Sequence, residues 1–142
     1  MSRRASINEL KSVVYPVRSA EQLSLARRAV LEWATRLEFS LVDRTKFVTA
    51  ASELARNAWV HGKGGEMTMT QLERDGLTGL RLVFADHGPG IENIGLALTD
   101  GFSSAGSMGK GLGGAKRLVN EFDIRSEPGR GTNVTVIQWK RR

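Results

Sequence analysis

The sequence of 142 residues contains no cysteine and only two histidines. Disulfide frameworks, thiolate zinc sites and a cysteine nucleophile are therefore excluded, and a metal site built on histidine is not expected. No apolar run approaches the roughly 18 residues that a membrane-spanning helix requires, and the first residues lack the apolar stretch of a signal peptide. We therefore expect a cytoplasmic protein without membrane contact.

Acidic residues are fewer than basic ones, 15 against 21, which gives a formal net charge of +6. Such an excess can indicate nucleic-acid binding. Acidic residues are interspersed with basic ones along the whole chain, however, and the single dense basic cluster, Lys140 to Arg142, is expected to be a solvated end. Nucleic-acid binding is therefore the weakest of the functions considered below.

Glycine is absent from the first 61 residues, and all 16 glycines lie between Gly62 and Gly131. The first part is therefore predicted to be helical, and the second to consist of strands and loops. Hydrophobic residues make up 40% of the chain and charged residues 25%, which is ordinary for a globular protein. We predict one domain over residues 1–142.

Two long helices are predicted in the first part. Ser19 followed by Gln22 is a capping-box pattern, and apolar residues then recur at helical spacing, so we expect a helix over 20–37. Asp43 is expected to cap a second helix that ends at Gly62.

Five strands are predicted, around residues 13–17, 67–70, 80–85, 123–127 and 132–139. The first is expected at an edge of the sheet because Pro16 has no N–H to donate, and the third is expected at the centre because it is almost entirely apolar. A turn at 74–76 separates two strands, and a short helix is expected through 116–119. The predicted fold class is α/β, a two-layer sandwich with a mixed, mostly antiparallel sheet of about five strands covered on one face by about three helices.

Three polar residues on the second helix, Glu53, Asn57 and His61, recur at intervals of four and share one face within about 80°. Asparagine offers Mg²⁺ a neutral oxygen ligand, and glutamate can deprotonate an attacking hydroxyl or water. The alternative is a solvated helix face on which Glu53 pairs with Arg56.

A turn rich in glycine follows the central strand, with Asp86, Gly88, Gly90 and Ile91. Glycine lets the backbone approach a ligand closely, and an aspartate at a strand end can accept a hydrogen bond from an exocyclic amine such as that of adenine. The alternative is a plain turn, since these residue types dominate turns.

A second glycine-rich run, residues 101–114, opens the short third helix. Its backbone N–H groups together with Lys110 are suited to binding phosphate. Gly109, Gly111 and Gly114 formally match a dinucleotide fingerprint, but no strand precedes them, and the run does not match a Walker A motif. A long loop of this kind is typical of a lid that closes over a bound nucleotide.

In order and spacing, these three groups resemble the ATP-binding signature of the Bergerat-fold (GHKL) superfamily, which includes gyrase, MutL, a heat-shock chaperone ATPase and the sensor histidine kinases. The matching motifs are Glu53-x-x-x-Asn57-x-x-x-His61, Asp86-x-Gly88-x-Gly90, Gly109-x-Gly111-x-Gly113 and Gly131-Thr132, and the resemblance spans residues 10–140. The chain has no dimerisation helix pair with a phospho-accepting histidine. It is therefore most similar to the small bacterial serine/threonine-protein kinases of partner-switching systems, and among these to the stressosome switch kinases.

The resemblance implies a Bergerat fold and a role for each matching residue. Asn57 would coordinate Mg²⁺ that bridges the phosphates of ATP, Glu53 would be the catalytic base, and Asp86 would bind adenine, supported by Thr132 through water. His61 could touch phosphate or have a structural role at the helix end. The remaining residues expected along the nucleotide are Gly88, Gly90, Ile91, Gly109, Lys110, Gly111, Leu112 and Gly113.

For function, the resemblance implies an ATP- and Mg²⁺-dependent protein kinase that phosphorylates a partner of the sulfate-transporter and anti-sigma antagonist (STAS) type. Added phosphate would break the contact and release the kinase to a second, downstream regulator. The alternative is an anti-sigma factor or another nucleotide-dependent binding module that sequesters its partner.

Overall fold

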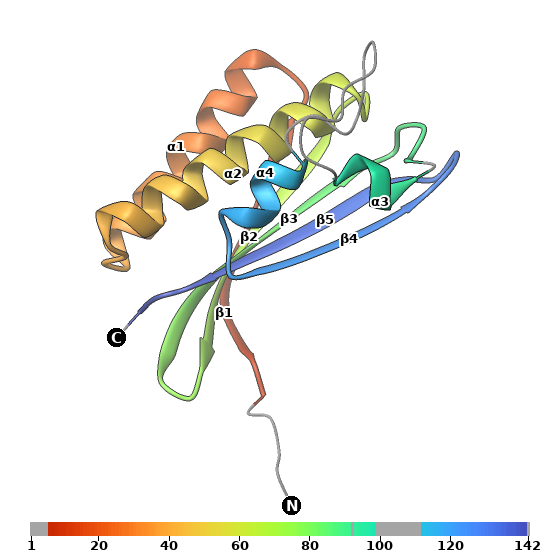
Figure 1. The fold of residues 1–142 in the computed structure, drawn as a ribbon. Helices are drawn as coiled ribbons and strands as arrows, with labels where there is room; N and C mark the ends of the chain where they lie inside the picture. Colours follow the sequence, from red (N-terminus) through yellow and green to blue (C-terminus); the bar gives the residue numbers. More distant parts are fainter. Residues whose placement is uncertain (1–5, 92, 99–111, 142) are drawn as a thin grey trace, which may run out of the picture.

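Five strands form one antiparallel sheet, and the main helices cover a single face of it (Figure 1). The computed structural model describes residues 6–91, 93–98 and 112–141. Along the chain, the elements are β1 (Asn8–Val17), α1 (Ala20–Arg36), α2 (Leu41–Val60), β2 (Gly65–Arg74), β3 (Leu77–Asp86), α3 (Ile94–Ala97), α4 (Leu112–Arg117), β4 (Glu121–Glu127) and β5 (Gly131–Trp139). The two-layer α/β prediction is confirmed, with one short helix, α3, that the sequence analysis does not predict.

The strand order β1-β2-β3-β5-β4 confirms both predicted strand positions. β1, which contains Pro16, lies at an edge, and the apolar β3 lies at the centre, paired with β2 and β5. The hairpin between β2 and β3 turns on Asp75 and Gly76, whose φ angles of 52° and 76° are those of a two-residue type I′ turn. The last helix ends at Arg117, before the predicted Val119.

The starts of the two long helices are capped by serine. At α1, the Ser19 hydroxyl accepts the Gln22 N–H at 3.1 Å, as predicted, while Gln22 Oε1 accepts the N–H of Arg18 rather than that of Ser19. The prediction for α2 is wrong, because the cap is Ser40, whose hydroxyl accepts the backbone N–H of Asp43 at 3.1 Å. Serine is short enough to reach back to the third N–H of the helix.

Asp43 instead forms an ion pair with the C-terminal segment. Arg141 donates from Nε and Nη2 to the two carboxylate oxygens at 2.8 and 3.1 Å, and the Asp43 side chain is only 7% exposed. The Lys140 N–H also donates to the Thr78 carbonyl at 2.8 Å. The basic end is therefore anchored to β3 through Lys140 and to the beginning of α2 through Arg141, while the Arg141 side chain remains 70% exposed, as expected for a solvated end.

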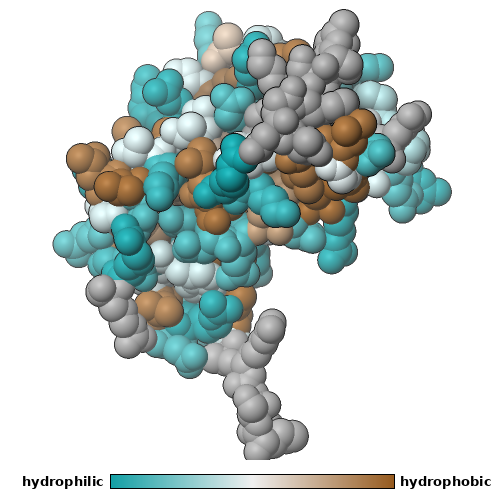
Figure 2. Space-filling model, viewed as in Figure 1, coloured by the Kyte–Doolittle hydropathy of each residue, from teal (hydrophilic) through white to brown (hydrophobic). Residues whose placement is uncertain are grey.

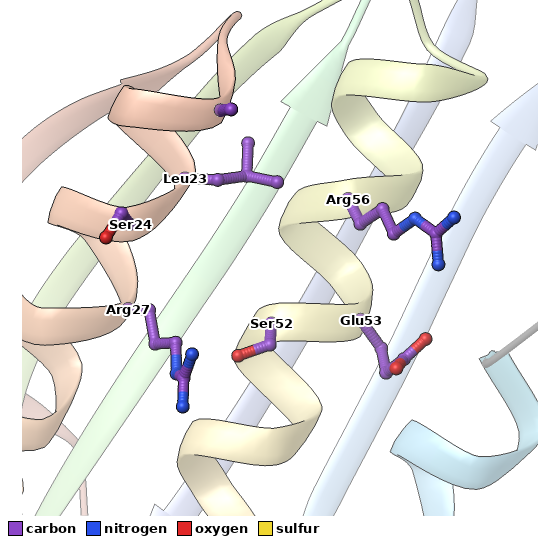
Figure 3. Close-up of a pocket in the computed structure, with 7 residues that line it drawn as sticks. Leu23, Ser24, Arg27, Ser52, Glu53 and Arg56 are labelled. Carbon is purple, nitrogen blue, oxygen red and sulfur yellow. The ribbon is translucent and has the colours of Figure 1, made fainter.

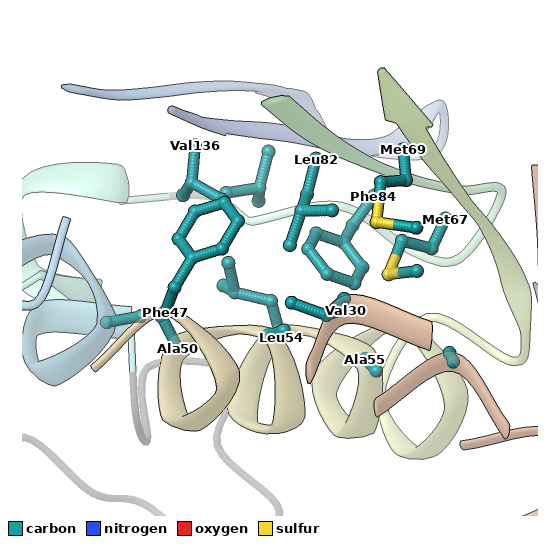
Figure 4. Close-up of a cluster of buried hydrophobic side chains, with 14 of the residues drawn as sticks. Val30, Phe47, Ala50, Leu54, Ala55, Met67, Met69, Leu82, Phe84 and Val136 are labelled. Carbon is teal, nitrogen blue, oxygen red and sulfur yellow. The ribbon is translucent and has the colours of Figure 1, made fainter. Parts of the chain in front are cut away.

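The core lies between α1, α2 and the inner face of the sheet (Figure 4). On α2, the side chains of Phe47 and Leu54 are at most 2% exposed. The alanines between them allow the helix to approach the strands closely. Facing them are Val30 from α1 and the strand residues Met67, Met69, Leu82, Phe84 and Val136. This packing fixes the position of α2 against the sheet, and with it the polar face of α2.

A smaller apolar cluster lies on the other face of the sheet, at the end of β5. It contains Leu72, Leu77, Ile137 and Trp139. The Trp139 ring covers Gly79, and the Arg74 guanidinium lies 4.3 Å from the ring centroid. Elsewhere, the space-filling view shows apolar patches separated by polar side chains (Figure 2).

Candidate functional site

The polar face of α2 places Glu53 and Asn57 one helical turn apart. Asn57 is 8% exposed and Glu53 is half-buried. His61 is the C-cap of this helix, and its N–H and that of Gly62 both donate to the Asn57 carbonyl at 3.0 Å. The backbone of His61 therefore closes the helix end, and its side chain is half-buried.

Asp86 is the last residue of the central strand β3, and its carboxyl group is buried. Oδ1 accepts the N–H of Gly88 at 2.9 Å and that of Thr132 at 3.2 Å. Among the described residues, Oδ2 makes no hydrogen bond. Burial raises the pKa of this carboxyl group, while the two N–H donors and nearby His87 act in the opposite direction.

Glycines bring the end of α2 against the end of β3. A Cβ on Gly62 would overlap the Asp86 carboxyl group, and a Cβ on Gly88 would lie 2.6 Å from the Gly62 Cα. Gly62 does not have a positive φ. Gly62 follows the helix as predicted, but the reason that only glycine fits there is the close approach of Asp86.

These contacts bring together residues from three distant parts of the sequence. The helix end after Asn57 meets Asp86, and Asp86 meets Thr132 of β5, which is 4% exposed. Ile91 is also buried, and Gly90 has a φ of 80° with its Cα against the Glu127 carbonyl. The helix, the first glycine turn and the last strand therefore form one continuous site around Asp86.

The second glycine-rich run is described only from Leu112 onward, and the predicted phosphate-binding residues Gly109, Lys110 and Gly111 lie outside the described residues. Leu112 and Gly113 begin α4, and both are buried. α4 packs against α2, so its first turn lies beside the helix that carries Glu53 and Asn57 (Figure 1).

The groups of the site offer a buried hydrogen-bond acceptor and an amide oxygen. Asp86 offers an acceptor oxygen without a partner among the described residues, where an amino group of a base can donate. The described residues contain no cluster of three acidic or histidine side chains that could hold a metal. Mg²⁺ in phosphate sites is typically bound by one or two protein oxygens, the phosphates and water, and the Asn57 amide oxygen fits that requirement.

A separate cavity of about 300 Å³ lies between α1 and α2 (Figure 3). Ser24 and Arg27 of α1 line it, and from α2 the lining residues are Ser52, Glu53 and Arg56. Neither Asp86 nor Thr132 lines this cavity, so it shares only Glu53 with the candidate site. Helical spacing alone gives no signal for it.

Sequence reasoning also missed Ser126 of β4. Its hydroxyl contacts the Ile91 N–H, the Gly131 carbonyl and the Thr132 hydroxyl. The predicted hairpin gave no signal for this contact, because a turn over 128–131 would place Ser126 opposite Asn133, whereas the observed register pairs Glu127 with Gly131 and Ser126 with Thr132.

Comparison with known proteins decides the family. The sequence profile of the histidine kinase-like ATPase domain matches residues 17–139. The chain belongs to this family. No helix in the described part of this histidine kinase-like ATPase is long and apolar enough to cross a membrane.

Two relatives illustrate the range of functions in the family. The chain is 40% identical over 116 residues to the serine/threonine-protein kinase RsbT of Bacillus subtilis, covering 82% of this chain and 87% of the relative. It is 31% identical over 123 residues to the anti-sigma F factor of Clostridium acetobutylicum, covering 82% and 85%.

A solved structure supports the fold. The crystal structure of the RsbU and RsbW domains of a Mycobacterium tuberculosis protein matches with a TM-score of 0.60 and 22% identity. The match covers 94% of this chain and 34% of that one, so this ATPase domain spans about a third of the solved chain.

Proposed function

We propose that this chain is an ATP- and Mg²⁺-dependent serine/threonine-protein kinase that regulates a bacterial signalling or stress response by partner switching. The observation that carries the proposal is the buried Asp86 carboxyl group, held by the Gly88 and Thr132 N–H groups at the end of α2, which bears Glu53 and Asn57. The family and the 40% identity to a serine/threonine-protein kinase support phosphoryl transfer as the reaction.

We assign recognition of the nucleotide base to the buried residues Asp86 and Thr132. Asp86 Oδ2 accepts from the adenine amino group, and Thr132 supports this contact. Gly88, Gly90 and Ile91 shape the turn beside the base. The phosphates are assigned to the second glycine run, Gly109, Lys110, Gly111, Leu112 and Gly113, and His61 is retained as a helix-end residue near them.

In the reaction, Glu53 accepts the proton of a serine or threonine hydroxyl on the partner. The hydroxyl oxygen forms a bond to the γ-phosphorus of ATP, and the bond to the β–γ bridging oxygen breaks, so ADP leaves. Asn57 would hold Mg²⁺, which when bound neutralises phosphate charge. Positioning and charge neutralisation supply most of the rate in such transfers.

The substrate we propose is a STAS-domain protein of the anti-sigma antagonist type. Phosphorylation adds about −1.5 to −2 charges at neutral pH to the partner surface. Because these charges are placed at the contact, the complex dissociates and the kinase becomes free to bind a second, downstream regulator. Phosphorylation of the partner therefore also controls whether the partner stays bound to the kinase.

Glu53→Gln tests the assignment of the base. Incubation of the wild type with labelled ATP, Mg²⁺ and a STAS partner should transfer phosphate to a serine or threonine. We expect the variant to lose about 10²- to 10⁴-fold in transfer rate, since that is the usual contribution of general-base catalysis, and to bind ADP as the wild type does.

The matched control is Glu32→Gln, which removes the same charge from an exposed position on α1. It should leave transfer unchanged. Full transfer by Glu53→Gln would show that another group is the base, and no transfer by the wild type to any STAS protein would contradict kinase function.

A second candidate is a binding module that sequesters a sigma factor, and the similarity to anti-sigma F factors favours it. In that case a pull-down retains a sigma factor, and no STAS protein is phosphorylated. Direct nucleic-acid binding is the third candidate and predicts an affinity for DNA that falls steeply with salt. Absence of DNA binding at low salt removes it.

A further inference from the structure

Ser126 lies at the junction of three segments that surround Asp86. It stands on β4 opposite Thr132 of β5, and its hydroxyl oxygen lies 2.8 Å from the Ile91 nitrogen. The same oxygen lies 3.0 Å from the Gly131 carbonyl oxygen and 2.8 Å from Thr132 Oγ1. One hydroxyl group therefore has three polar partners.

The number of protons determines the direction of each of these hydrogen bonds. A carbonyl oxygen can only accept, so the single proton of Ser126 goes to Gly131. A backbone N–H can only donate, so Ser126 accepts from Ile91. All three contacts are satisfied only when Thr132 donates its hydroxyl proton to Ser126.

This direction fixes the chemistry that Thr132 presents to the site. With its proton committed to Ser126, the Thr132 oxygen offers only lone pairs, and its backbone N–H is bound to Asp86 Oδ1. Asp86 Oδ2 is also an acceptor. In place of the water-mediated contact that the resemblance implies, we place the Thr132 oxygen directly beside the base. It and Asp86 Oδ2 then suit the amino group of adenine and oppose the carbonyl oxygen that guanine carries at the same position.

We propose that Ser126 is a specificity-determining positioning residue, which holds the Thr132 hydroxyl as an acceptor and thereby favours adenine over guanine nucleotides. The inference rests on the proposed function, because it takes an adenine nucleotide as the ligand of Asp86. Ser126 itself acts through Thr132 rather than on the base.

Ser126→Ala releases the Thr132 proton, which can then donate to guanine. We expect the ratio of the dissociation constants of GDP and ADP, measured by titration calorimetry with Mg²⁺, to fall about three- to tenfold, the equivalent of one hydrogen bond. If the substitution acted only by removing the hydrogen bonds to Ile91 and Gly131, it would weaken the binding of GDP and ADP equally and leave the ratio unchanged.

Ser12→Ala is the matched control. Ser12 and Thr70 form the same cross-strand hydroxyl pair at 2.8 Å, between β1 and β2 and away from Asp86. This variant should leave the GDP/ADP ratio at the wild-type value.

Thr132→Val provides a second measurement that does not depend on the folding of Ser126→Ala. Without the hydroxyl group, the valine variant should also show a lower ratio, and adding Ser126→Ala to it should change the ratio no further. An unchanged ratio in Ser126→Ala, or an equal effect of that substitution in the valine background, overturns the inference. A wild type that binds no adenine nucleotide contradicts the proposed function instead.

Discussion

At the scale of single residues, the charged Asp86 carboxylate lowers the stability of the folded protein at neutral pH when no nucleotide is bound. Its carboxyl group is buried, and the pKa is raised above the ordinary value, mainly by desolvation. A raised pKa means that the folded state favours the protonated form. The contribution to stability is therefore fully present below about pH 4, the unfolded pKa, and is lost as the pH rises through the folded pKa.

Asp86→Asn separates this cost from binding. Asparagine Oδ1 can still accept the Gly88 and Thr132 N–H groups. We expect the nucleotide-free variant to be at least as stable as the wild type at pH 7, and to lose that advantage near pH 4. Denaturant titrations at both pH values measure it, and lower stability at pH 7 would contradict the desolvation argument.

The same substitution should weaken nucleotide binding, because an amide NH₂ in place of Oδ2 opposes the amino group of adenine. We expect at least a tenfold increase in the dissociation constant of ADP, measured by titration calorimetry, since one lost charge-assisted hydrogen bond is worth about 1.5–3 kcal/mol. Unchanged ADP affinity would show that Asp86 does not bind the base.

At the scale of elements, the position of α2 depends on contacts at both of its ends. Its beginning is held by the Ser40 cap and by the pair between Asp43 and Arg141, and its end meets Asp86 through Gly62. The core residues Phe47 and Leu54 fix the helix between these points. The polar face with Glu53 and Asn57 is therefore positioned by packing and by the two ends together.

Arg141→Ala tests the contact at the beginning of α2. The Asp43 carboxylate is nearly buried while Arg141 is 70% exposed, so water can replace part of what is lost. We expect the free energy of unfolding to fall by about 1–2 kcal/mol, between the values for exposed pairs and for buried pairs.

Arg125→Ala is the matched control for this prediction. Arg125 pairs with Asp123 on β4 at 3.3 Å, and both side chains are largely exposed. Its removal should change the free energy of unfolding by less than about 0.5 kcal/mol. Equal effects of the two substitutions in denaturant titrations would show that the Asp43 contact has no special role.

At the scale of the whole molecule, a nucleotide that contacts α2, β3 and β5 should stabilise the entire fold. A ligand that binds only the folded state at 100 times its dissociation constant adds about 2.7 kcal/mol to the free energy of unfolding. We therefore expect the melting temperature to rise with ADP and Mg²⁺ concentration in the wild type, and to rise much less in Asp86→Asn. A melting temperature independent of ADP would contradict nucleotide binding.

Much of this architecture follows from local sequence patterns. Pro16 correctly predicted that β1 lies at the sheet edge, and the apolar sequence of β3 correctly predicted its central position. Asp75-Gly76 correctly predicted the hairpin turn. Each of these depends on a property of one segment, such as a missing N–H or a positive φ, so the sequence is sufficient. The two-layer α/β fold and the order of the motifs were predictable for the same reason.

Other features were decided only by tertiary structure. The sequence offers Asp43 as a helix cap, but the helix begins at Leu41, so Ser40 is the cap and the Asp43 carboxylate binds an arginine 98 residues away. It offers Gly62 as a helix terminator, but the contact that requires glycine is with Asp86, and Ser126 gains its role only when β4 and β5 pair. Local patterns fix the elements because they act within one segment, whereas partners far apart in the chain are selected only when the sheet and helices pack together.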